Sequence, residues 1–131
     1  MSSLLSVSDI KDDVKYILDL ASKIKAGEVE EKLTDDIGLA LQNVDAVFTD
    51  VWVSMGDEAE AKQRQKDFAP FQVNKDLMSL ANDGTIFMHC LPAIRGQEVT
   101  AEVIDGPQSV IYDEAENRMH AQKAVLYHYL K

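Results

Sequence analysis

The feature that most constrains the fold is a short apolar run, residues 87–93, which contains the only cysteine and then a proline. Residues 85–90 predict a strand, and Pro92 ends it because proline has no N–H for a sheet ladder. In open α/β sheets, ligands bind outside the carboxyl ends of the strands, where loops and helix N-termini meet. The run therefore predicts a strand that ends beside a binding site.

Two further segments have the same form, an apolar run that ends in polar residues. Residues 45–53 lead into Ser54, Met55 and Gly56, and residues 109–113 lead into the last predicted helix. Helical patterns between strands favour a mostly parallel sheet with right-handed crossovers. The 45–53 run is nearly all apolar, as expected when helices cover both faces of a sheet. We expect an α/β fold, part of a doubly wound domain, with three short strands whose polar ends share one site.

Apolar residues at helical spacing predict the helices around these strands. The clearest helix begins after Ser8, a predicted N-cap, and ends at Gly27, a predicted C-cap. Shorter helices are predicted over residues 36–43, 56–67, 75–81 and 100–103, with Thr34 and Asn74 as caps of the first and third. The last helix, residues 114–131, has a stripe that we expect to be buried: Ala115, Met119, Gln122, Leu126 and Tyr129.

Composition limits the classes of function. The 131 residues suffice for one domain, and the formal net charge of -10 opposes binding to nucleic acid or to an anionic membrane. A single cysteine excludes an internal disulfide and a multi-cysteine metal site. No apolar stretch approaches the roughly 20 residues that span a bilayer. The N-terminus lacks the pattern of a secretory signal, so we expect a cytoplasmic protein.

The residues at the strand ends have structural as well as functional interpretations. Asp50 can cap the loop after its strand, Cys90 can be a small buried hydrophobe, and Arg118 can pair with Glu114 at helical spacing. His89 precedes Cys90 on a strand, so its side chain is expected to point to the opposite face and not to act as a base for the thiol. Three aromatic residues are expected in the core: Trp52, Phe87 and Tyr112.

Three motifs together resemble the second half of an ornithine carbamoyltransferase. They are residues 50–56 (DVWVSMG), 89–92 (HCLP) and 113–120 (DEAENRMH), and they occur in the order of that family. The first predicted helix resembles the first helix of the family, and Cys90 in place of proline after His89 favours the ornithine branch over the aspartate branch. The resemblance implies an N-terminal helix, residues 1–27, packed against the last helix of a reduced Rossmann-like ornithine domain, residues 28–131, in one compact unit.

The family transfers a carbamoyl group from carbamoyl phosphate to the side-chain amine of L-ornithine, giving L-citrulline and phosphate. By resemblance, Asp50 binds the α-amino group of ornithine, and Ser54 and Met55 help to seat that substrate. Cys90 and Leu91 are implied at the reaction centre, next to carbamoyl phosphate. The resemblance implies no metal ion and no organic cofactor.

Arg118 is implied as a further carbamoyl phosphate contact and, with Cys90, as a catalytic residue. The sequence departs from the family between the first helix and the 45–53 strand, where only about residues 27–34 stand in place of the carbamoyl-phosphate domain. The Ser-x-Arg-Thr-Arg and His-Pro-x-Gln segments that hold carbamoyl phosphate in the family are absent from this sequence.

We therefore expect an internal deletion that removes half of the family's active site. Two hypotheses follow: an enzyme that is active only when another chain supplies the missing half, or a non-catalytic module derived from the ornithine domain. The second is favoured for the isolated chain. The family's trimer depends on surfaces that are missing here, so a different homo-oligomer stays open, and a shortened sheet leaves an edge that invites a second copy.

Overall fold

The computed structural model describes residues 19, 22–28, 33–53, 56 and 58–130. The chain divides into two compact units, Met1–Leu33 and Thr34–Lys131. Most of the predicted N-terminal helix lies outside the described residues, as do Ser54 and Met55, so the packing of the first helix against the last stays a prediction. In the first unit residues 22–25 are helical.

Gly27 ends this helix as the sequence predicts. Its φ is 72°, in the left-handed region that glycine adopts without a steric penalty. The Gly27 N–H donates to the Ile24 carbonyl and the Glu28 N–H donates to the Lys23 carbonyl, each at 2.9 Å. This pair of bonds is the Schellman arrangement, which satisfies carbonyl groups that the helix end leaves free.

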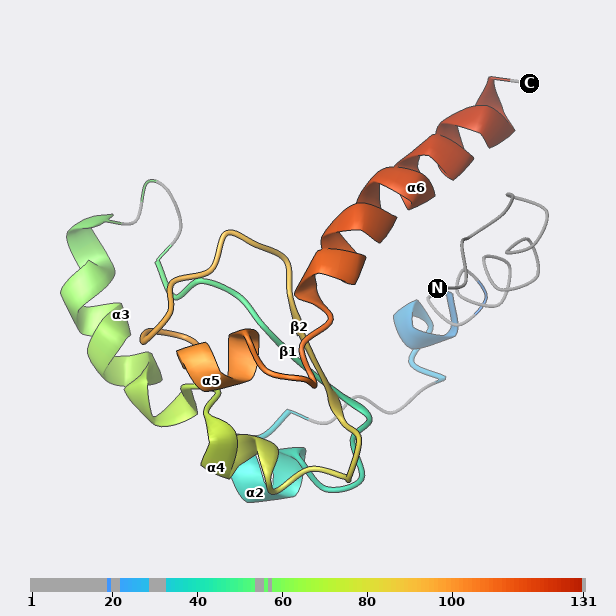
Figure 1. Cartoon of the computed structure of the whole chain (residues 1–131). Coiled ribbons are helices and arrows are strands. Elements are labelled where there is room, and N and C mark those ends of the chain that lie inside the picture. The colour runs from blue at the N-terminus through green and yellow to red at the C-terminus, as the bar shows by residue number, and fades with distance from the viewer. Residues whose placement is uncertain (1–18, 20–21, 29–32, 54–55, 57, 131) are drawn as a thin grey trace. The chain divides into compact units, whose positions relative to one another are not determined.

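The second unit contains a parallel sheet of two strands, β1 (Ala46–Thr49) and β2 (Ile86–His89). Val47 lies opposite Phe87 and Thr49 lies opposite His89, so the two strands begin and end together. The α/β class and the parallel pairing predicted from the sequence are therefore confirmed. Figure 1 shows the two strands side by side at the centre of this unit.

The predicted third strand, residues 109–113, does not form. Ser109 makes only a single β-bridge, which pairs it with Phe87. Its two hydrogen bonds come from the neighbours of Ser109: the Phe87 N–H donates to the Gln108 carbonyl, and the Val110 N–H donates to the Phe87 carbonyl. Helix α6 (Ile111–Tyr129) begins directly afterwards. Its first turn contains Asp113 and Glu114, and acidic residues favour a helix N-terminus because of the helix dipole. The helix therefore replaces the strand after one bridge.

The remaining described helices are short and follow the predicted order. They are α2 (Ile37–Ala40), the 3₁₀ turn η2 (Glu58–Glu60), α3 (Ala61–Phe68), the 3₁₀ turn η3 (Ala69–Phe71), α4 (Lys75–Met78) and α5 (Ala101–Ile104). The Asn74 side chain accepts from the Leu77 N–H at 2.9 Å, so the predicted cap of α4 is confirmed. Asp36, not Thr34, caps α2, because its carboxylate accepts from the Leu39 N–H at 3.0 Å.

The hydrophobic core lies against one face of the two strands. Phe87 is fully buried at its centre, and Val47 on β1 is buried beside it. Side chains alternate along a strand, so Phe48 and Ile86 point to the other face, where they are 56% and 36% exposed. The expectation of two covered faces is therefore wrong for the described part of the chain. The core also contains Leu41, Val73, Met78, Val99, Val103, Ile104 and Ile111.

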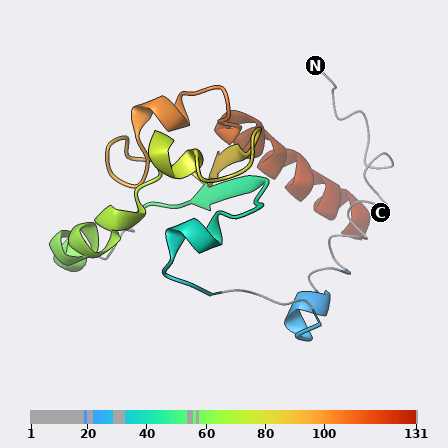
Figure 2. The same ribbon diagram turned by 90° about the horizontal axis from the view of Figure 1, so that it is seen from below.

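The second unit by itself does not bury the predicted stripe of the last helix, so burial of the stripe against the first helix stays a prediction. Met119, Leu126 and Tyr129 are 47%, 58% and 79% exposed, whereas Ile111 and Ala124 are buried. A helix of 19 residues is about 28 Å long, and a strand of four residues is about 13 Å long. The sheet can cover only the start of α6, and Figures 1 and 2 show the helix continuing past the strands. The other two stripe residues, Ala115 and Gln122, are exposed as well.

Tyr112 is 72% exposed, so its predicted place in the core is wrong, while that of Phe87 is confirmed.

Within the described ranges, no helix combines the length and the apolar character that crossing a bilayer requires. In both ribbon views α3 and α6 extend on opposite sides of the strands, which leaves the carboxyl ends of β1 and β2 between them.

We predict that Phe87→Ala lowers the free energy of unfolding by about 3–5 kcal/mol, because the substitution removes a fully buried ring. Phe48→Ala is the matched control on the neighbouring strand, where we expect a change of about 0.5 kcal/mol or less because the ring is largely exposed. Urea denaturation followed by circular dichroism measures both values. Equal losses in the two variants would contradict the assignment of the core.

Candidate functional site

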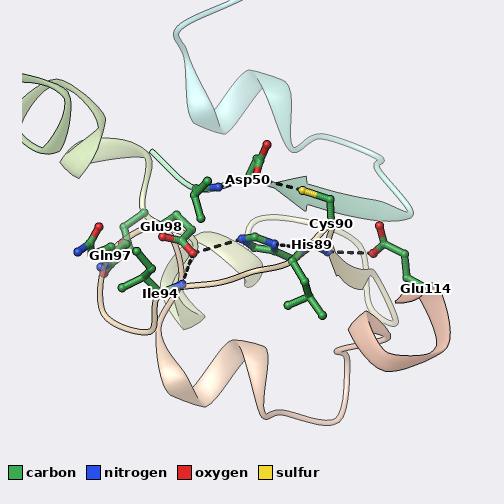
Figure 3. A network of polar contacts seen from close by, with 10 residues as sticks. Asp50, His89, Cys90, Ile94, Gln97, Glu98 and Glu114 are labelled. Atoms are coloured by element: carbon green, nitrogen blue, oxygen red, sulfur yellow. Dashed lines mark hydrogen bonds and ion pairs between the residues drawn. The ribbon is translucent and has the colours of Figure 1, made fainter. Parts of the chain in front are cut away.

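The carboxyl ends of β1 and β2 bring Asp50 and Cys90 into contact. Thr49 and His89 are paired in the sheet register, so the next residue of each strand leaves the sheet at the same edge. The Cys90 thiol donates a hydrogen bond to Asp50 Oδ1 at 3.1 Å (Figure 3). The same carboxylate oxygen accepts from the Val51 N–H at 2.7 Å. The two strand ends therefore lie together as the sequence predicts, and their use as one site stays a prediction.

This contact sets the charge of both groups. The hydrogen bonds from Cys90 and Val51 lower the pKa of Asp50, because they stabilise its carboxylate. The same hydrogen bond, together with burial and the negative charge of Asp50, raises the pKa of Cys90. Only a thiolate is strongly nucleophilic, so the pair holds Cys90 as a neutral thiol beside a charged carboxylate. The Asp50–Cys90 pair therefore carries one negative charge and no activated nucleophile.

His89 lies closer to this pair than the strand alternation predicts. One atom of metal-ligand type from each of Asp50, His89 and Cys90 lies within 4.8 Å of the other two. The ring is nevertheless engaged elsewhere: its Nε2 lies 3.2 Å from Glu98 Oε1, and its Nδ1 accepts from the Leu91 N–H at 2.9 Å. Because both ring nitrogens have partners, His89 is not available as a base for Cys90.

The same bonds decide whether the three side chains form a metal centre. A zinc site needs three or four ligands in tetrahedral geometry, and His89 could join it only by giving up its contact with either Leu91 or Glu98. Asp50 and Cys90 are already bonded to each other through a proton that a metal ion would displace. The hydrogen bonds therefore favour a thiol–carboxylate pair over a bound metal ion.

Two glutamates support this edge of the sheet: Glu98, which the sequence analysis did not name, and Glu114, which it named only as an ion-pair partner for Arg118. Glu98 is fully buried against His89, and its Oε1 also accepts from the Ile94 N–H. Glu114, in the first turn of α6, accepts from the His89 N–H at 3.0 Å and so joins the helix to the end of β2. Glu114 carried a sequence signal, an acid in a helix first turn, whereas Glu98 becomes recognisable only once its loop is folded.

Arg118 does not make the predicted ion pair with Glu114. The Glu114 carboxylate is bonded to the backbone of β2 instead, and no ion pair of Arg118 is seen among the described residues. The Arg118 side chain is exposed on α6, one turn beyond Glu114. Its role as a carbamoyl phosphate contact stays a prediction.

A pocket of about 380 Å³ opens beside Asp50. Its walls include Trp52, Arg64, Phe68 and Phe71, and the Trp52 and Phe68 rings lie 6.4 Å apart between centroids. Trp52, expected in the core, is thus only half-buried and faces this space. The pocket thus offers aromatic surface together with one carboxylate, Asp50, and one guanidinium, Arg64, so that both charges of a small zwitterionic molecule could find a partner.

Leu91 takes an unusual backbone conformation directly after Cys90. Its φ is 56°, in the left-handed region that side chains other than glycine seldom adopt. Leu91 is half-buried and packs against the core. The turn that begins here carries the chain away from β2, so the Cys90 thiol and the Leu91 backbone are both held at the strand end.

The comparisons with known proteins agree with the geometry. Residues 3–129 match the family model for aspartate/ornithine carbamoyltransferase, Asp/Orn binding domain. The ornithine carbamoyltransferase of Methanobrevibacter smithii is 71% identical over 116 residues, which are 88% of this chain and 38% of that protein. The structure of ornithine carbamoyltransferase from Pyrococcus furiosus is 62% identical with a TM-score of 0.64, over 70% of this chain and 29% of that chain.

A more distant structure contains ligands. It is a mutant N-acetyl-L-ornithine transcarbamylase complexed with carbamyl phosphate and N-succinyl-L-norvaline, 31% identical with a TM-score of 0.66, over 86% of this chain and 34% of that chain. The chain belongs to the aspartate/ornithine carbamoyltransferase family, within the Asp/Orn binding domain. It spans less than two fifths of the length of these three relatives.

We predict that Asp50→Ala makes Cys90 react faster with iodoacetamide near neutral pH. The substitution removes the hydrogen-bond acceptor and the negative charge that raise the thiol pKa, so the pKa falls and more thiolate forms at a given pH. Cys90 is the only cysteine, so the rate of alkylation followed by mass spectrometry across pH reports this group alone.

Asp83→Ala is the matched control, because Asp83 is an exposed acid in the turn before β2. We expect its pH profile to coincide with that of the unmodified chain. Identical profiles for Asp50→Ala and the unmodified chain would show that the carboxylate does not hold the thiol in solution.

Proposed function

We propose that the chain provides the ornithine-facing half of a carbamoyl transfer site. The reaction is transfer of a carbamoyl group from carbamoyl phosphate to the side-chain amine of L-ornithine, with L-citrulline and phosphate as products. The observation that carries this proposal is the contact of the Cys90 thiol with Asp50 at the joined ends of β1 and β2, in a chain of this family. Asp50, Ser54 and Met55 are proposed to bind ornithine.

The charge of the site suits an amino acid that carries an ammonium group. Asp50 is ionised because its pKa is lowered, and it is exposed at the pocket rim, where a cation can approach. Trp52, Phe68 and Phe71 offer apolar surface for the methylene groups of ornithine. The proposed contact is thus an ion pair at one end of the substrate and apolar packing along its stem.

The chemical step joins the neutral side-chain amine to the carbonyl carbon of carbamoyl phosphate. The new C–N bond forms, the C–O bond to phosphate breaks, phosphate leaves with its electron pair, and the amine loses a proton. Catalysis of this step is mainly positioning and stabilisation of the charge on the leaving phosphate. In this chain Cys90 and Leu91 are proposed to lie beside the reacting carbon, and Arg118 is proposed to contact the phosphate.

The isolated chain is proposed to be a non-catalytic module. A single arginine cannot replace a cluster of bidentate donors around a phosphate, and the net charge of -10 repels an anionic substrate. The absence of the Ser-x-Arg-Thr-Arg and His-Pro-x-Gln segments from this sequence supports an internal deletion relative to the family. Turnover would then require another chain that supplies the phosphate-binding half.

The test combines ornithine titration by calorimetry with a citrulline assay on the purified chain. We predict measurable heat of ornithine binding, loss of that heat in Asp50→Asn, and its retention in Asp83→Asn, whose acid is exposed in the turn before β2. We predict no citrulline above background from the chain alone.

Two outcomes would overturn parts of the proposal. Citrulline formation that disappears in Arg118→Ala would show that this half-site still catalyses the reaction. An absence of ornithine heat in the folded, unmodified chain would leave a module whose motifs no longer bind the amino acid.

A further inference from the structure

We infer that Glu98 is a positioning residue for the strand end that carries Cys90. It acts through His89, whose ring links the buried carboxylate to the backbone of Leu91. Figure 3 shows this chain of contacts from Glu98 through His89 to the edge where Cys90 meets Asp50. Among the described residues, Glu98 makes no hydrogen bond to Asp50 or Cys90, so its effect on them is indirect.

The first step is the pairing of two fully buried polar side chains. The side chains of His89 and Glu98 have no exposed surface, and Nε2 lies 3.2 Å from Oε1. A buried carboxylate is costly unless hydrogen-bond donors compensate for the lost water. Here the Oε1 atom has two donors, the His89 ring and the Ile94 N–H, while the buried Oε2 atom has none among the described residues. Among the described residues, the hydrogen bonds that offset the cost of burying the Glu98 carboxylate are therefore all made by Oε1.

The second step concerns the position of the ring hydrogen. The Leu91 N–H donates to His89 Nδ1 at 2.9 Å, so Nδ1 must offer its lone pair. The neutral ring then carries its hydrogen on Nε2, which faces Glu98. Without an acceptor at Glu98, the buried Nε2–H would have no hydrogen-bond partner. In the competing tautomer the hydrogen is on Nδ1, so that two N–H groups, those of Nδ1 and Leu91, would face each other. Glu98 thus selects the tautomer that can bind Leu91.

The third step is the backbone of Leu91. A residue with a side chain at φ 56° persists only where its surroundings hold it, because the left-handed conformation is strained for any residue other than glycine. The bond from its N–H to His89 is one of the contacts that hold it. Since Leu91 follows Cys90 directly, a change in this turn changes where the thiol lies relative to Asp50.

The consequence for carbamoyl transfer rests on the proposed function, in which Cys90 and Leu91 border the reacting carbon. The structural claim does not need a substrate. It states that the Glu98 carboxylate fixes the His89 tautomer, and that this tautomer fixes the Leu91 turn. A failure of ornithine binding would therefore leave this inference untouched.

The first test uses the unmodified chain. Nitrogen-15 NMR of the imidazole rings shows which nitrogen carries the hydrogen, and variants of His120 and His128 assign the three histidines. We expect His89 to carry hydrogen on Nε2 alone. A ring with hydrogen on Nδ1 would overturn the inference without any change at Glu98.

The second test compares Glu98→Ala with Glu98→Gln and with the control Glu102→Ala, an exposed glutamate on α5. The amide oxygen of glutamine can still accept the Nε2 hydrogen, so we expect Glu98→Gln to keep the tautomer. In Glu98→Ala we expect hydrogen on Nδ1 and exchange of the Leu91 amide faster by about tenfold or more, equivalent to about 1.4 kcal/mol.

These readouts separate positioning from a general loss of stability. If Glu98 only stabilised the fold, Glu98→Ala would lower the free energy of unfolding and leave the His89 tautomer unchanged. The glutamine variant would then have no altered tautomer to restore. If folded Glu98→Ala keeps Nε2–H and the original Leu91 exchange rate, the inference is wrong. If Glu98→Ala does not fold, a Glu98→Gln variant that folds with hydrogen on Nδ1 would equally overturn it.

Discussion

The parallel register of β1 and β2 is the constraint on which the rest of the second unit depends. Thr49 opposite His89 makes the two strands end level, and only then do Asp50 and Cys90 leave the sheet close enough for a 3.1 Å hydrogen bond. A slip of one residue would also turn Phe87 from the core to the exposed face. Burial of one aromatic ring and assembly of the site are therefore fixed by the same pairing.

Two polar pairs at this edge have opposite environments and complementary roles. The Asp50–Cys90 pair lies near solvent, where a charged carboxylate can meet a ligand. The His89–Glu98 pair is fully buried, where hydrogen bonds are strong and alternatives are costly. The buried pair reaches the turn at Leu91 through the His89 ring, and the exposed pair is the one we propose to meet the substrate. Glu114 adds a third connection by holding the start of α6 to the end of β2.

Much of the fold and part of the site follow from sequence patterns alone. The α/β class, the parallel strands, the Asn74 cap and the Gly27 cap all depend on local preferences that act within a few residues. The family motifs predict Asp50 and Cys90 as site residues, and the structure places the two side chains in contact. The failure of the third strand was not predictable in this way, because a strand forms only where a partner surface is available.

The sequence by itself determined the Gly27 and Asn74 helix caps, the presence of two parallel strands, and the family to which the chain belongs, although β1 ends at Thr49 and not at Val53. These properties reside in short motifs whose physical effects are local. Only the tertiary structure decided that Glu98 would face His89 and that Glu114 would bond the β2 backbone rather than Arg118. Those contacts join residues 9 and 25 positions apart. They form because folding of the loop and of α6 brings each carboxylate beside donors at the end of β2, which spacing along the chain cannot reveal.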